Sequence, residues 1–233
     1  MISMARLQFI DIQASIDTVS VLRGVSFALE AGETVAFIGR NGAGKTSILR
    51  TIMGLTTVTS GQMLFDGNDI NPLPVHKRAE LGIGYVPEDR RMIPKFSVMD
   101  NIRLGAWANK MSAAEFQTKF DSICESLPDI VALKNRTAGQ LSGGQQKMAA
   151  LARSLVCGSK LLLLDEPFQG LAPVLAKQYA ESLTGLRDQY PDLTIVITES
   201  NPALVTAMSN RAYTIERGEL FENGNTMGQS NHG

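Results

Sequence analysis

The chain has 233 residues, of which 44% are hydrophobic and 19% are charged, and its 22 Lys and Arg nearly balance its 23 Asp and Glu. A formal net charge of −1 gives no reason to expect a broad basic surface for nucleic acid or anionic lipid. Two cysteines are too few for a disulfide framework or a zinc cluster, and no apolar run reaches the roughly 20 residues that span a bilayer. We therefore expect a globular, intracellular protein with no membrane segment of its own.

The first forty residues alternate in the way that is typical of β-strands. Leu7, Phe9 and Ile12 give a pattern of period two, and residues 25–29 repeat it more clearly. Residues 34–38 then form a short, mostly apolar run, as in a strand that is buried on both faces. The front of the chain is therefore predicted to form antiparallel strands followed by a buried strand.

Strands and helices alternate through the rest of the chain, interrupted by one long helical region. Apolar residues at helical spacing predict the helices, and short apolar runs predict the strands. In chain order we expect a helix at 46–54, a strand at 62–65, a helix at 75–80, a strand at 82–86, helical structure from 97 to 133, a helix at 144–156, a strand at 161–164, a helix at 173–189, a strand at 194–198, a short helix at 202–208 and a strand at 213–216. This layout predicts one α/β domain with a helical insertion of about 55 residues.

A glycine-rich loop follows the buried strand and precedes a helix. Residues 39–46, Gly-Arg-Asn-Gly-Ala-Gly-Lys-Thr, match the pattern G-x-x-x-x-G-K-[ST]. The glycines let successive backbone N–H groups turn toward phosphate oxygens, and the helix adds the positive end of its dipole. Lys45 can reach the β- and γ-phosphates, and the Thr46 hydroxyl can ligate Mg²⁺. The motif predicts a nucleoside triphosphate site made of Gly39, Arg40, Asn41, Gly42, Ala43, Gly44, Lys45, Thr46 and Ser47.

Two carboxylates end the buried strand at 161–164. This strand delivers Asp165 to a position where it can hold magnesium, and Glu166 then projects toward the γ-phosphate, where it can orient or deprotonate water. Taken alone, the same residues also fit a buried strand that ends in a solvated acidic turn. Beside a phosphate loop, the catalytic interpretation is favoured.

A third motif precedes the acidic strand end and begins a helix. It comprises Leu141, Ser142, Gly143, Gly144 and Gln145. Alone it fits a helix N-cap, but the amides of the two glycines also make a second anion-binding helix N-terminus. In this order with the other two motifs, the chain resembles the nucleotide-binding subunit of an ATP-binding cassette (ABC) transporter, from about Leu7 to Leu220.

A finer resemblance is to the ATPases that serve uptake of branched-chain amino acids, urea or short amides. Four stretches carry it: residues 39–42, 84–91, 101–107 and 170–173. In that subgroup a glutamate commonly occupies the loop after the strand that ends in Val-Pro, and here that residue is Glu88. The resemblance implies a role for Glu88 in catalysis and in holding the metal.

The resemblance also implies a fold and an assembly. The fold is a P-loop NTPase (RecA-like) core with an antiparallel β subdomain, together about 1–88 and 144–222, and an inserted helical subdomain at about 89–143; residues 223–233 are expected to be a flexible tail. ATP and Mg²⁺ would lie between the phosphate loop of one subunit and the Ser142 motif of a second, identical or different, cassette. Permease subunits would hold the dimer at the cytoplasmic face of the membrane, and a substrate-binding protein would act through them.

Two positions depart from the family pattern. Ser200 stands where most cassettes have a histidine that contacts the γ-phosphate, and serine has no cationic form. Ile16 stands where an aromatic residue normally stacks on adenine. We therefore hypothesise that the chain binds ATP and Mg²⁺ but that its own site turns over slowly.

Three functions compete at this point. The first is the ATPase subunit of an importer, and the second is an ABC-type ATPase that works without a permease. Near-neutral charge and a single cassette disfavour the second, because a clamp around a polyanion needs basic surface. The third is a regulatory cassette that binds nucleotide with weak hydrolysis, which Ser200 keeps open.

Overall fold

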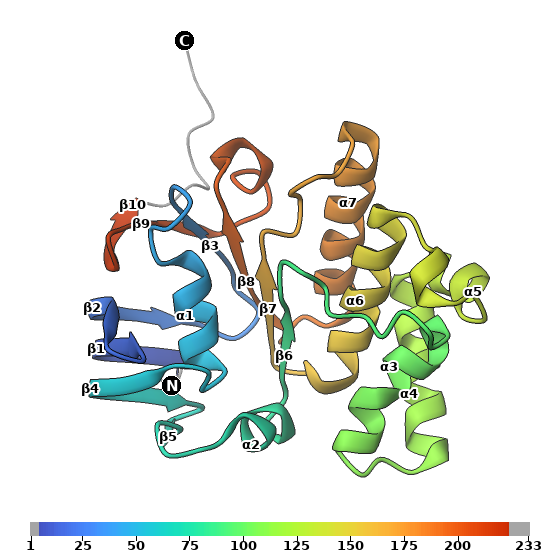
Figure 1. The fold of residues 1–233 in the computed structure, drawn as a ribbon, viewed down its shortest axis with the longest axis horizontal. Helices are drawn as coiled ribbons and strands as arrows, with labels where there is room; N and C mark the ends of the chain where they lie inside the picture. The colour runs from blue at the N-terminus through green and yellow to red at the C-terminus, as the bar shows by residue number, and fades with distance from the viewer. Residues whose placement is uncertain (1–4, 224–233) are drawn as a thin grey trace.

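Two β-sheets form the framework of the protein (Figure 1). The computed structural model describes residues 5–223. One sheet is antiparallel with strand order β2-β1-β4-β5, and the other has six strands in the order β10-β9-β3-β8-β7-β6. The strands are β1 (Leu7–Ile16), β2 (Val19–Leu29), β3 (Thr34–Ile38), β4 (Thr57–Phe65), β5 (Asn68–Asp69), β6 (Ile83–Val86), β7 (Leu161–Asp165), β8 (Thr194–Glu199), β9 (Arg211–Glu216) and β10 (Glu219–Asn223).

The helices lie on both sides of the six-stranded sheet (Figure 1). They are α1 (Lys45–Ile52), α2 (Val75–Glu80), α3 (Val98–Ala108), α4 (Ala113–Ser126), α5 (Asp129–Leu133), α6 (Gly143–Cys157) and α7 (Pro173–Gln189), with 3₁₀ turns at Ala138–Gln140 and Pro202–Leu204. This mixed α/β architecture is the fold that we expected, with its antiparallel sheet at the front of the chain.

The structure differs from three details of the sequence-based expectation. β4 begins at Thr57 instead of residue 62, because the backbone of its polar first half pairs with β1. The short helix expected at 202–208 is regular only over Pro202–Leu204. The flexible tail expected from residue 223 is wrong for Asn223, which ends β10; residues 224–233 lie outside the described part of the chain.

The direction of the central strands places several loops together. β6, β7, β8, β3 and β9 run parallel, while β10 pairs with β9 in the opposite direction. Since the carboxyl ends of parallel strands meet at one edge, the loops that follow β3, β6, β7 and β8 lie at the same edge of the sheet. These loops contain the glycine motif, Glu88, Glu166 and Ser200.

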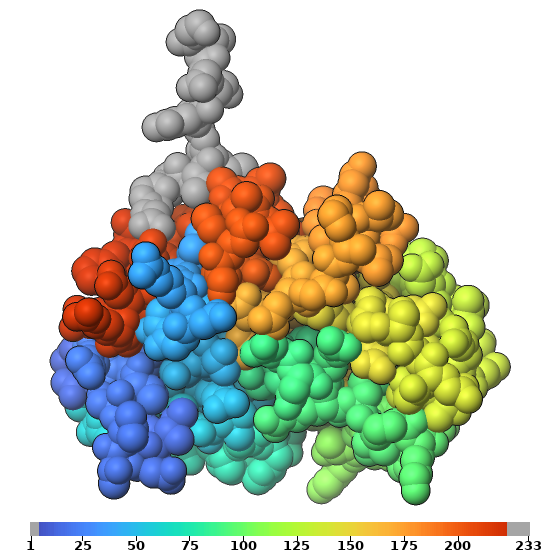
Figure 2. All heavy atoms as spheres, turned by 45° about the horizontal axis from the view of Figure 1, so that its top comes forward, coloured from blue at the N-terminus to red at the C-terminus, as the bar shows by residue number. Residues whose placement is uncertain are grey.

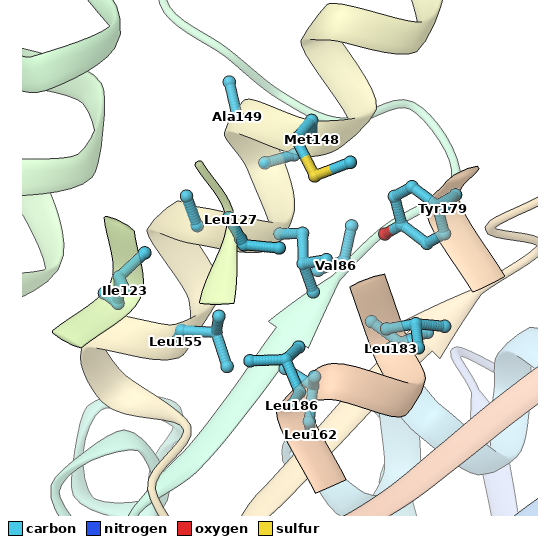
Figure 3. Packing of buried hydrophobic residues seen from close by; sticks show 14 of the residues in the cluster. Val86, Ile123, Leu127, Met148, Ala149, Leu155, Leu162, Tyr179, Leu183 and Leu186 are labelled. Atoms are coloured by element: carbon cyan, nitrogen blue, oxygen red, sulfur yellow. The ribbon is translucent and has the colours of Figure 1, made fainter. Parts of the chain in front are cut away.

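The six-stranded sheet separates two hydrophobic cores. On β7, Leu162 and Leu164 face the core beneath α6 and α7, whereas Leu161 and Leu163 face the core that α1 and the antiparallel sheet cover. Figure 3 shows the first of these cores, where α4, α6 and α7 converge on Leu162. The alternation follows from the two-residue period of a strand that is buried on both faces.

The helical region packs beside the sheet domain through α6. Figure 2 shows the green and yellow helical segments on the side of the molecule opposite the blue N-terminal strands. Local signals start its helices: Ser97 caps α3 by accepting from the Asp100 N–H, and Ser112 forms a capping box with Glu115 at the start of α4. The segment between residues 89 and 143 therefore forms helices of its own that rest on α6.

Candidate functional site

The glycine motif forms a tight loop between β3 and α1. Gly44, the N-cap of α1, has φ 116° and no side chain caps the helix, so the first N–H groups of α1 have no side-chain acceptor at the N-cap. A Cβ on Gly39 would lie 2.5 Å from the carbonyl oxygen of Ile215, so no larger residue fits there. The loop thus presents backbone N–H groups and a helix N-terminus, the arrangement that binds phosphate.

A cleft of about 590 Å³ opens over this loop, within the range of nucleotide-sized ligand sites. The loop and the start of α1 contribute seven consecutive residues, 41–47, and the sheet edge contributes Glu88, Glu166 and Gln169. Ile16 does not line this cleft: the β1–β2 hairpin reaches it through the first residues of β2, Val19, Ser20 and Val21. The remaining lining residues are Arg23, Arg217 and Gly218.

Lys45 is the cation at the bottom of the cleft, and only 5% of it is exposed. Its Nζ donates to the carbonyl oxygens of Gly39 and Arg40 at 2.8 and 3.1 Å and to Ser200 Oγ at 3.0 Å. Nζ also lies 2.9 Å from Glu166 Oε1 in a nearly buried ion pair. The structure therefore brings together Lys45, Glu166 and Ser200, three residues that are far apart in the chain.

Asp165 is the second carboxylate of the site and ends β7. Its Oδ1 accepts from Thr46 Oγ1 at 2.9 Å and from Thr198 Oγ1 at 2.8 Å. Its Oδ2 accepts from Tyr85 OH at 3.3 Å, and burial followed by the charge of Asp165 raises the pKa of this phenol. The hydroxyl of Thr46 beside a carboxylate fits Mg²⁺, which takes one or two protein oxygens and leaves its other positions to water and phosphate.

Glu166 has the geometry of a strained, tightly held residue. Its φ is 46°, in the left-handed region, and its side chain accepts from Ser200 N–H at 3.2 Å and from Ser200 Oγ at 2.7 Å. Burial opposes ionisation of Glu166, but the hydrogen bonds from Ser200 and Lys45 outweigh it and hold the pKa of this carboxyl below its usual value. Glu166 is therefore ionised at neutral pH and able to accept a proton from water at the phosphate loop.

Glu199 is a buried acid that the sequence patterns do not single out. Its carboxylate accepts from the Phe168 N–H at 2.9 Å, and 2% of the residue is exposed. Burial, followed by a hydrogen bond with Glu166 and the charge of that residue, raises the pKa of Glu199 to about 7. Its place directly after the apolar strand expected at 194–198, like that of Asp165 after the strand expected at 161–164, is the one signal that could have drawn attention to it.

We expect Glu199→Gln to stabilise the protein more at pH 8 than at pH 5. Because its pKa rises from 4.5 to about 7 on folding, the folded state becomes less stable as pH rises through this window, by at most about 3 kcal/mol. Glutamine keeps an acceptor for Phe168 and removes this penalty. Melting temperatures at the two pH values, with the exposed Glu181→Gln as control, test this. Equal gains at both pH values would contradict it.

The third motif lies at the start of α6. Ser142 caps the helix by accepting from the Gln145 N–H, while the Gln145 side chain accepts from the Ser142 N–H. Gly143 and Gly144 form the first turn, and Leu141 is packed into the helical core. Ser142, Gly144 and Gln145 line a separate hollow of about 320 Å³, so these residues do not reach the phosphate-loop cleft of their own subunit.

Comparison with known proteins decides the family. Residues 22–169 match the ABC transporter family. This chain belongs to the ABC transporter family. A probable branched-chain amino acid transport ATP-binding protein, LivF, of Archaeoglobus fulgidus is 33% identical over 94% of this chain and 91% of its own length. The lipopolysaccharide export system ATP-binding protein LptB of Escherichia coli K12 is also 33% identical, over 88% of this chain and 84% of its own length.

The fold agrees with solved structures of the ABC family. The structure of MJ1267, an ATP-binding cassette of an ABC transporter in its ADP conformation, matches with a TM-score of 0.80 and 26% identity over 94% of this chain and 90% of that one. The chain is thus an ABC ATP-binding subunit that hydrolyses ATP to drive transport. Among the similar solved structures, MJ0796 is a dimeric cassette and cbiO1 is part of the ABC transporter complex cbiONQ. Within residues 5–223, no helix has the length and apolarity needed to cross a membrane.

Proposed function

We propose that this ABC subunit binds Mg·ATP in the cleft over residues 39–46 and hydrolyses it with Glu166 as the general base. The ion pair and hydrogen bonds that join Lys45, Glu166 and Ser200 are the observation that carries this assignment. Thr46, Asp165 and Glu88 are the residues that would hold magnesium, which would neutralise phosphate charge. Glu166 would take the proton of the attacking water.

We propose further that Ser142, Gly143 and Gly144 act on ATP bound by a second cassette, the same or a different chain. Their separation from the cleft of their own subunit supports a site that is completed in the dimer. The segment at 89–143 and the Glu88 loop would meet the permease. The subunit would then lie at the cytoplasmic face of the membrane, peripheral to it, and a substrate-binding protein would act through the permease.

For the transported substrate we propose branched-chain amino acids or related small amides. The archaeal relative and the four subgroup stretches support this, although a relative named for lipopolysaccharide export is equally identical. Co-purification of the tagged chain identifies its permease, and uptake of labelled leucine and of urea into vesicles that hold the complex tests the substrate. Uptake of neither compound would overturn the proposed substrates.

Ser200 favours a second candidate, a regulatory cassette with weak hydrolysis. Its hydroxyl donates to Glu166 Oε1 and lies 2.9 Å from Asn41 Oδ1, and it supplies no positive charge to the γ-phosphate.

We expect Ser200→His to raise ATP turnover about tenfold, or ~1.4 kcal/mol. A cationic imidazole at this position balances negative charge that develops on the phosphate. Phosphate release by the assembled complex is the measurement, and Ser182→His on an exposed face of α7 is the control. Unchanged or lower turnover in Ser200→His would remove the slow-site hypothesis.

A further inference from the structure

Lys147 is a buried cation that belongs neither to the phosphate loop nor to the Ser142 motif. It lies on α6, only 4% of it is exposed, and it does not line the nucleotide cleft. Its Nζ donates to two backbone carbonyl oxygens, that of Glu166 at 2.9 Å and that of Pro167 at 2.7 Å. A buried ammonium group is retained only where such acceptors satisfy it.

One of these two carbonyls belongs to a residue with a strained backbone. Glu166 has φ 46°, a conformation that a residue with a Cβ keeps only when its surroundings impose it. On the other side of the same residue, the Glu166 N–H donates to the Thr198 carbonyl and hydroxyl oxygens, both at 3.1 Å. The Glu166 carbonyl also accepts from the Gln169 N–H at 3.2 Å. With the hydrogen bond from Lys147, both the N–H and the carbonyl of Glu166 are held by neighbouring residues.

The charges around Lys147 keep it a cation at neutral pH. Burial and the nearby Arg90 lower its pKa to about 8, while Glu199, Glu88 and Glu166 oppose that decrease. An ammonium makes stronger hydrogen bonds to carbonyl oxygens than a neutral amide donor does. At neutral pH the hydrogen bond from Lys147 to the Glu166 carbonyl is therefore a strong, charge-assisted one.

We propose that Lys147 is a positioning residue that holds Glu166 in its catalytic orientation and ties it to helix α6. Ser142 caps the same helix five residues earlier, about 7.5 Å along its axis. The orientation of the general base therefore depends on the position of the helix that presents Ser142. This inference rests on the proposed function, in which Glu166 is the base.

The test separates turnover from nucleotide affinity in the full-length chain. Lys147→Met keeps an unbranched side chain one heavy atom shorter and removes both hydrogen bonds. We expect single-turnover hydrolysis at saturating Mg·ATP to slow by about tenfold to a hundredfold, because small misplacements of catalytic groups have effects of this size. The Kd for ATP should stay within threefold. Lys147→Gln, which keeps an uncharged NH2 donor group, should give an intermediate rate.

Two controls exclude a merely structural effect. Arg78 is a second buried cation, 2% exposed, that donates to the carbonyl oxygens of Thr51, Ile52, Leu73 and Asn71, far along the chain from Glu166. Arg78→Met should lower the melting temperature without slowing hydrolysis per folded molecule. Lys177→Met, at an exposed site on α7, should change neither quantity.

The outcomes distinguish this inference from the proposed function. If Lys147→Met hydrolyses ATP within twofold of the unchanged protein, or if its rate falls only in step with its folded fraction, Lys147 does not position Glu166. If Lys147→Met does not fold, the same comparison is made with Lys147→Gln. If Glu166→Gln itself retains full turnover, the role of Glu166 as base is wrong, whatever Lys147 does.

Discussion

Glu166→Gln lowers ATP turnover by about 10²- to 10⁴-fold and leaves ATP bound, if Glu166 is the general base. Glutamine has nearly the same shape and keeps an acceptor for the Ser200 N–H, which donates to the carboxylate at 3.2 Å. An amide cannot take the proton of the attacking water, so the chemical step slows while the contacts to phosphate from the loop remain. Phosphate release at saturating Mg·ATP and a titration with a fluorescent ATP analogue measure the two quantities.

The matched control for this change is Glu181→Gln. Glu181 lies on α7 with 64% of its side chain exposed and pairs loosely with Lys177 at 3.8 Å. Its loss should leave turnover within twofold. A decrease of less than tenfold in Glu166→Gln would mean that another group accepts the proton.

Lys45→Met is expected to weaken ATP binding, whereas Glu166→Gln is expected to slow hydrolysis and leave binding unchanged. We expect ATP affinity to fall about a hundredfold, or ~2.7 kcal/mol, because methionine has no charge to offer the phosphates. The nucleotide-free protein should also melt at a lower temperature, since Glu166 loses a cation 2.9 Å away in a pair whose side chains are 5% and 7% exposed. Calorimetric titration with ATP and thermal melting measure these effects.

A double variant checks the cause of the lower melting temperature. Lys45→Met with Glu166→Gln leaves no carboxylate buried without a partner, so it should melt above Lys45→Met alone. Lys177→Met is the control for loss of an exposed lysine. An affinity change of less than threefold in Lys45→Met would contradict the assignment of the cleft to ATP.

The parts of the fold that the sequence predicts well are those with strong local signals. The helices expected at 75–80 and 173–189 have the bounds of α2 and α7, and the apolar run at 161–164 lies in β7. The phosphate loop and the Asp165–Glu166 pair are each a continuous stretch of sequence. Their chemistry can therefore be predicted before any strand order is known. The helical region from 97 to 133 can also be predicted, because its apolar residues have helical spacing and serines cap two of its helices.

Two neighbours of Glu166, Glu199 and Lys147, were not predicted, because their positions depend on strand order and helix packing. Glu199 and Ser200 reach Glu166 only because β8 pairs with β7 in a register that sets Asp165 opposite Thr198. Lys147 is buried on α6, although lysines are almost never fully buried, so its residue type alone does not predict a contact with the Glu166 backbone. The contact between Lys147 and the Glu166 carbonyl has no local sequence signal.

The residues of the β1–β2 hairpin that line the cleft were also not predicted correctly. Alignment to the family pattern points to Ile16, yet the cleft is lined by residues 19–21 of the same hairpin. The pairing of β1 with β2 shifts register between Phe9 and Ile12 and twice more before Ser15. Each irregularity changes which side chains face a given direction, so motif alignment cannot place a side chain across it.

The alternation of β7 between two cores separates two kinds of sequence change. A substitution at Leu162 or Leu164 alters the packing under α6 and α7, whereas one at Leu161 or Leu163 alters the packing under the phosphate loop. A substitution that changes the volume of one of these side chains is therefore felt first in one core, while the other core keeps its own contacts.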